Sequence, residues 1–121
     1  KNLARFTGNS LEEIAKYLKI DTQFIYSSTL QKNNDLKAQD KVIAICKELE
    51  ASEYINSIGG QDLYKKTDFE RYGIKLSFIK SHDINYKQFN NDFIPSLSII
   101  DVMMFNSPEE ISKMLDDYEL I

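Results

Sequence analysis

Apolar side chains recur every three or four positions in several segments of the chain, a spacing typical of amphipathic helices. The clearest example is residues 37–51, where Val42, Ile45, Cys46 and Leu49 share one helical face. A shorter helix is predicted over residues 10–19, because Leu11, Ile14, Ala15 and Leu18 also recur at helical spacing.

Three capping-box patterns mark where helices are expected to begin. Ser10 with Glu13 and Thr67 with Glu70 have capping-box spacing, and Gly73 is typical of the residue that ends a helix. A third box begins at Ser107, with Pro108 at the favoured first helical position. These signals predict helices over residues 10–19 and 67–72 and from residue 107 onward, and the apolar segment 97–105 forms another.

Three segments instead have the composition or the alternation of β-strands: residues 22–27, 53–57 and 74–78. Strands that alternate with helices pair in parallel through crossover connections. We therefore expect an α/β fold, with a layered parallel sheet of about three strands, crossover helices and two closing C-terminal helices. We see no linker or repeat, so residues 1–121 are expected to form a single domain.

Composition narrows the class of protein. The 121 residues are 42% hydrophobic and 28% charged, enough to bury about two-thirds of the chain's surface on folding. The formal net charge is -4, and no run of basic residues offers a footprint for nucleic acid. No apolar run is long enough to span a membrane, and residues 1–10 do not resemble a signal peptide. We expect a cytoplasmic protein, although a chain that does not begin with Met can be a piece of a longer one.

In a parallel sheet, ligands bind beyond the carboxyl ends of the strands. The turn at residues 56–62, which contains Asn56, Gly59, Gly60 and Gln61, follows the second predicted strand. Its two glycines allow close approach of the backbone to a ligand or a positive φ, and their amides can hold an anion. A plain tight turn explains the same residues, because neither P-loop nor dinucleotide-binding spacing is present.

His82, the only histidine, follows the third predicted strand. It is a candidate general acid or base, or else an ordinary surface or packing residue. The adjacent Asp83 would point away from it in an extended chain. Cys46 lies in the middle of a helix on its apolar face, so we expect it to be buried rather than nucleophilic. One histidine and one cysteine argue against a tetrahedral zinc site, and the sequence points to no particular cofactor.

The segment 86–93 combines rings and amides that could hold a sugar or a base: Tyr86, Gln88 and Phe89. A packed surface loop is the alternative. Asp101 interrupts the most apolar helix, so it either faces solvent or is held inside by hydrogen bonds. Lys37, Gln39 and Asp40 begin the strongest helix, where they either reach the site or form a solvated first turn.

Several of these segments together resemble the WbqC-like protein family. The most specific are the Ile-Gly-Gly turn at residues 58–60, Tyr-Lys-Gln-Phe at 86–89 and Ser-Ile-Ile-Asp-Val at 98–102. The resemblance extends over most of the chain from about Ser10 and corresponds to the C-terminal half of these proteins.

The resemblance implies a bacterial protein of surface-polysaccharide or O-antigen biosynthesis, and a transferase that places an acyl or aminoacyl group on a nucleotide-activated sugar. It also implies an N-terminal half as a partner, and a homo-oligomer is possible. In this interpretation Asp101 and His82 are the candidate catalytic residues. The substrate-binding candidates are Asn56, Gly59, Gly60, Gln61, Tyr86, Gln88 and Phe89. The alternative is a domain that binds a partner or a nucleotide without catalysis, because no triad, metal set or phosphate motif is recognisable.

Overall fold

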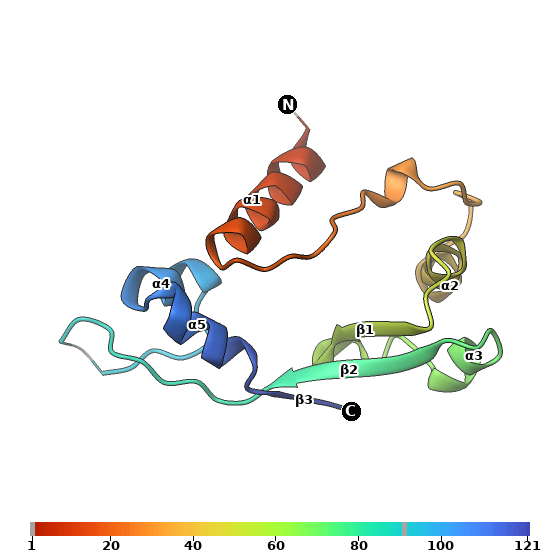
Figure 1. Cartoon of the computed structure of the whole chain (residues 1–121). Helices are drawn as coiled ribbons and strands as arrows, with labels where there is room; N and C mark the ends of the chain where they lie inside the picture. The colour runs from red at the N-terminus through yellow and green to blue at the C-terminus, as the bar shows by residue number, and fades with distance from the viewer. Residues whose placement is uncertain (1, 91) are drawn as a thin grey trace. The chain divides into compact units, whose positions relative to one another are not determined.

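The structure is a computed structural model that describes residues 2–90 and 92–121, so Asn91 of the aromatic segment lies outside the described residues. The chain divides into two compact units (Figure 1). One comprises the residues up to Phe24 together with His82–Asp117. The other comprises Ile25–Ser81 and Tyr118–Ile121. We call them the helical unit and the sheet unit.

The sheet unit contains a three-stranded mixed sheet with β2 (Lys75–Ser81) in the centre. β1 (Glu53–Ser57) pairs with β2 in parallel, with Tyr54 opposite Leu76. β3 (Tyr118–Leu120) pairs with the other edge of β2 in the antiparallel sense, with Glu119 opposite Lys80. An α/β fold is thereby confirmed, with two of its strands where the sequence predicted them.

Both longer helices of this unit, α2 (Ala38–Glu48) and α3 (Lys66–Glu70), contribute to one core. Leu76 and Phe78 alternate on β2 and therefore lie on one face of the sheet, where Cys46 of α2 and Phe69 of α3 join them. The ring of Tyr54 stacks on that of Phe69, with centroids 5.5 Å apart. The two helices consequently cover the same face of the sheet.

The helical unit is built from α1 (Leu3–Tyr17), α4 (Ile99–Phe105) and α5 (Pro108–Leu115). Its core is formed by Leu18, Val102 and Ile111, one from the end of α1 and one from each C-terminal helix. Ile111 is fully buried. Ile14 and Leu18 of the predicted helical face contribute to this core, whereas Leu11 of the same face is 53% exposed.

Of the three predicted capping boxes, the structure confirms one. The box at Ser107 is confirmed, because Ser107 Oγ accepts from Glu110 N and Glu110 Oε2 accepts from Ser107 N. The expected start at Ser10 is wrong: α1 begins earlier, with the side chain of Asn2 as its cap, and Ser10 Oγ donates to a carbonyl within the helix. The box at Thr67 is also wrong, since α3 begins at Lys66 without a side-chain cap.

The predicted strand at residues 22–27 is wrong as well. Residues 22–26 have no regular secondary structure and pair with no described strand, and Ser27 begins a 3₁₀ turn, η1 (Ser27–Thr29). The third strand of the sheet is instead β3, which the sequence did not predict. A β-like composition does not produce a strand without a neighbouring edge to pair with.

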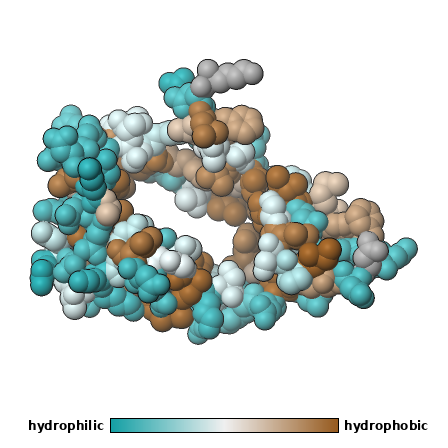
Figure 2. Space-filling model, turned by 180° about the vertical axis from the view of Figure 1, so that it is seen from behind, coloured by the Kyte–Doolittle hydropathy of each residue, from teal (hydrophilic) through white to brown (hydrophobic). Residues whose placement is uncertain are grey.

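The surface of the molecule includes many large apolar side chains (Figure 2). The most exposed are Leu3, Phe6, Phe89 and Met104, each at least 73% exposed. Among the described residues, no helix has the length and hydrophobicity needed to cross a membrane.

Candidate functional site

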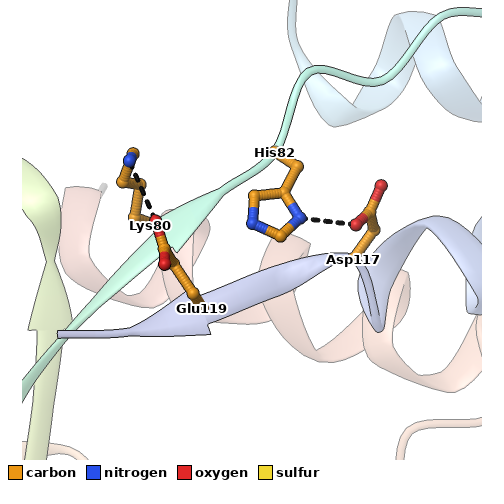
Figure 3. Close-up of polar contacts among 4 residues, drawn as sticks. All are labelled: Lys80, His82, Asp117 and Glu119. Atoms are coloured by element: carbon orange, nitrogen blue, oxygen red, sulfur yellow. Dashed lines mark hydrogen bonds and ion pairs between the residues drawn. The ribbon is translucent and has the colours of Figure 1, made fainter.

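His82 is paired with a carboxylate that lies 35 positions further along the chain. Its Nδ1 is 2.6 Å from Oδ1 of Asp117, and its backbone N–H donates to the carbonyl of Asp117 at 3.1 Å (Figure 3). His82 follows the last residue of β2 and Asp117 precedes the first residue of β3, so the end of the β2–β3 ladder brings them face to face. The expectation that Asp83 would not be the partner is consistent with this geometry.

The contact determines which nitrogen of the imidazole is available. A carboxylate only accepts hydrogen bonds, so Nδ1 carries the shared hydrogen and Nε2 of the neutral ring keeps its lone pair. In Figure 3 the second ring nitrogen points away from Asp117. The His82 side chain is 48% exposed. This is the arrangement of a general base with an orienting carboxylate.

Figure 3 also shows a second cross-strand pair, Lys80 and Glu119. Their Nζ and Oε1 atoms are 2.9 Å apart, at directly opposite positions of β2 and β3. The hydrogen bond from Glu119 raises the pKa of Lys80, which therefore stays cationic. The pair helps to fix the register that also sets the positions of His82 and Asp117.

Asp101 is held by hydrogen bonds rather than facing solvent. It is half-buried in the first turn of α4, and its Oδ2 accepts from Tyr86 Oη at 2.6 Å and from Gln88 Nε2 at 2.9 Å. The bond to Asp101 raises the pKa of Tyr86. Three of the predicted site residues are therefore brought together, in a cluster where one carboxylate oxygen already has two donors.

The side chain of Gln88 is hydrogen-bonded to the backbone of Ile94, six residues further along the chain. Its Nε2 donates to the carbonyl of Ile94 at 3.1 Å, and its Oε1 accepts from Ile94 N at 2.8 Å, as a backbone pair would. Phe89 has a φ of 42° and is 73% exposed, with its ring edge-on to that of Phe105. Both polar atoms of the Gln88 side chain are therefore hydrogen-bonded within the protein, whereas the Phe89 side chain is exposed and accessible to a ligand.

The two glycines of the turn differ sharply. Gly60 is buried, and a Cβ there would lie 2.9 Å from Asn56 Nδ2. A Cβ on Gly59 would have no atom within 4 Å. Neither glycine has a positive φ; among the described glycines only Gly73 does, at 72°. Of the two uses that the sequence left open for these glycines, a positive φ is therefore excluded, and close approach of the backbone to a ligand stays a prediction. The turn is a 3₁₀ turn, η2 (Ile58–Gly60), in which Gln61 N donates to Ile58 O.

The remaining candidates have structural positions. Cys46 is 5% exposed, and burial raises the pKa of its thiol, which confirms the core assignment. Gln39 joins the starts of α2 and α3, because its Nε2 donates to Asp68 and its Oε1 accepts from Lys65 N. In the part of the chain that the structure describes, no group of three or more His, Cys, Asp or Glu side chains is placed to hold a metal ion.

The candidate residues fall in both units. The helical unit contains His82, Tyr86, Gln88, Phe89 and Asp101, whereas the sheet unit contains Asn56, Gly59, Gly60 and Gln61. Asp117 is the one residue of the His82 pair that sequence reasoning missed. Only recognition of residues 118–120 as a strand antiparallel to β2 would have found it.

Residues 1–113 match the WbqC-like protein family. The chain belongs to this family. The matched region begins at residue 1, whereas the resemblance seen in the sequence begins at about Ser10. Membership associates the WbqC-like chain with polysaccharide biosynthesis. No curated protein and no solved structure matches it.

Proposed function

We propose that this WbqC-like chain acts in bacterial surface-polysaccharide biosynthesis of the O-antigen type, where it transfers an acyl or aminoacyl group to a nucleotide-activated sugar in the cytoplasm. The observation that carries the proposal is the 2.6 Å contact between His82 Nδ1 and Asp117 Oδ1, on an imidazole that is half exposed. Family membership supplies the biosynthetic context.

The chemistry follows from the free Nε2. A sugar hydroxyl or amine attacks the acyl carbonyl carbon, and Nε2 of His82 takes the proton that the attacking group loses. Asp117 stabilises the imidazolium that forms. When the acyl carbon's bond to its leaving group breaks, the proton passes from Nε2 to the leaving group, and the neutral imidazole is restored.

Two further candidates of the helical unit have supporting roles in this proposal. The exposed Phe89 side chain offers a stacking surface for a sugar. Asp101 has one oxygen engaged by Tyr86 and Gln88, which suits it to orienting a ligand better than to taking up a proton.

The test is a transfer assay with a panel of nucleotide-sugars and acyl or aminoacyl donors, read by mass spectrometry of the product. His82→Ala is expected to reduce the rate about a hundredfold or more, as loss of a general base does. Asp117→Asn is expected to reduce kcat more than it changes KM, because the ring is then held in the wrong tautomer.

Two neighbours serve as matched controls, because Asp83 and Asp116 are exposed carboxylates beside His82 and Asp117. Asp83→Asn and Asp116→Asn remove the same charge and should leave the rate within about twofold, since exposed charges that do not contact the ring contribute little. A folded His82→Ala variant that transfers at the wild-type rate would refute the proposal.

A second function, binding of a partner without catalysis, is favoured by one observation. Loop 88–97 and α4 expose Phe89, Ile94, Leu97, Ile100 and Met104, at 47–76% each. Exposed apolar groups in this number are typical of interaction surfaces. If a second copy of the chain binds there, Ile100→Lys should convert a dimer to a monomer in sedimentation experiments. A wild-type chain that stays monomeric at high concentration would refute self-association.

A further inference from the structure

An open groove of about 580 Å³ lies in the sheet unit, between the segment that follows η1 and helix α2. Its volume is in the range of small-molecule sites. Apolar side chains from both sides contribute to its lining: Leu36, Ile43 and Ala44. Asp40 lines the groove, but His82, Asp117 and the residues given supporting roles above do not, so the groove is distinct from the site proposed above.

Two lysines and one aromatic ring line this groove. Lys47 Nζ lies 4.7 Å from the centroid of the Tyr72 ring, and Lys32 Nζ donates to the carbonyl of Ser27. In residues 2–90 and 92–121, neither lysine forms an ion pair with a carboxylate. Tyr72 is 54% exposed, so its ring is accessible beside Lys47. The groove therefore presents two cations beside a stacking surface.

The groove also contains two carboxylates, Asp40 and Glu48. Together with Lys32 and Lys47 they leave its formal charge at zero, so a small anion such as inorganic phosphate gains little from charge alone. Carboxylates accept hydrogen bonds from the hydroxyl and amino groups of a ribose or a base. A ligand that combines a planar ring, hydroxyl groups and one anionic group uses all three features of the lining.

We propose that this groove binds a nucleoside phosphate, with its base on Tyr72 and its phosphate on Lys32 and Lys47. The choice of a nucleoside phosphate among ring-and-anion ligands rests on the proposed function, because a nucleotide-activated sugar carries such a group. The groove itself is argued from residues of the sheet unit only.

The test is titration of the isotope-labelled 121-residue chain with UMP and with AMP, followed by the backbone amide signals in NMR spectra. Uridine, adenosine and inorganic phosphate serve as matched partial ligands. We expect a nucleotide to shift amides of α2 and of Tyr72 with a Kd of about 1 mM or tighter, whereas each partial ligand binds at least about tenfold more weakly.

Three variants localise the effect. Tyr72→Leu keeps apolar bulk but removes the ring, and should weaken binding about five- to hundredfold, the usual range for loss of stacking on a base. Lys47→Gln should weaken it about three- to tenfold by removing a charged donor. Lys66→Gln, at an exposed lysine of α3 that does not line the groove, should change the Kd less than twofold, because exposed charges that do not contact the ligand contribute little.

The proposal is overturned if nucleoside and nucleotide bind equally, if Lys66→Gln weakens binding as much as Lys47→Gln does, or if no amide shifts at about ten times the expected Kd. The binding test requires no turnover. Nucleotide binding that survives in His82→Ala, alongside an absence of transfer by the wild type, would refute the proposed function while supporting this site.

Discussion

Substitution of the two adjacent glycines of η2 by alanine should have opposite effects on stability. A Cβ at residue 60 would lie 2.9 Å from Asn56 Nδ2 and 3.1 Å from Asn56 Cγ, whereas a Cβ at residue 59 meets nothing within 4 Å. Both glycines have backbone conformations outside the positive-φ region, so the difference lies in packing rather than in backbone strain.

The magnitude follows from what Asn56 must give up. To make room for a methyl group at residue 60, its side chain has to move, and its Oδ1 then loses the 2.7 Å hydrogen bond from Ser57 N. Because the clashing atoms belong to one movable side chain and the bond is exposed, Gly60→Ala should destabilise by about 0.5–1.5 kcal/mol. Gly59→Ala should instead stabilise by about 0.4–1 kcal/mol, because alanine restricts the unfolded chain.

The assay is urea unfolding followed by circular dichroism, which gives the free energy of unfolding of each variant. Asn56→Ala combined with Gly60→Ala removes the clash, so the double-mutant cycle should give a favourable coupling of about 1 kcal/mol. If Gly59→Ala destabilises as much as Gly60→Ala, or if the cycle shows no coupling, the reasoning about Asn56 is refuted.

Three further predictions concern other residues. Cys46 should resist alkylation at about pH 8 in the folded chain and react on unfolding, because burial raises its pKa; rapid labelling of the folded chain would contradict this. Bonds from Ser107 lower the folded pKa of Glu110 below 4.5, so its stabilisation is complete above that pH and is lost as the pH falls. Glu110→Gln should therefore show a smaller loss of melting temperature on acidification, and an equal loss would refute the capping role. Gln88→Ala should destabilise by about 1–3 kcal/mol and speed proteolysis of the loop before Ile94, because both bonds to Ile94 are lost; unchanged proteolysis would contradict the bracing role.

The parts of the fold that sequence predicted are those specified by neighbouring residues. The start of α5 follows from Ser107, Pro108 and Glu110, which lie within one turn of each other. β3 could not be predicted in this way, since its three residues are all exposed and form a strand only by pairing with β2. Residues 22–27 show the converse: their composition is typical of a strand, but they do not pair with an edge of the sheet and form no strand.

In the candidate site too, the sequence indicated individual residues but not their long-range contacts. His82 could be selected as the only histidine, placed beyond a strand, but its partner Asp117 depends on a strand pairing between distant segments. Gln88 was selected as a ligand contact, yet it braces its own loop through atoms of Ile94 and Asp101. Residue type shows which side chains could act as a base or bind a ligand. Contacts between distant segments determine which of them have an atom available for it.

The orientation of the His82 ring can be measured directly, because His82 is the only histidine and gives a single set of ring signals. Long-range ¹H–¹⁵N correlation spectra of the neutral ring report which nitrogen carries the hydrogen. The hydrogen bond to Asp117 predicts hydrogen on Nδ1 and a free lone pair on Nε2, and Asp117→Asn should shift the ring toward the Nε2–H form. A wild-type ring that carries its hydrogen on Nε2, or one that Asp117→Asn leaves unchanged, would contradict the role of His82 as a base oriented by Asp117.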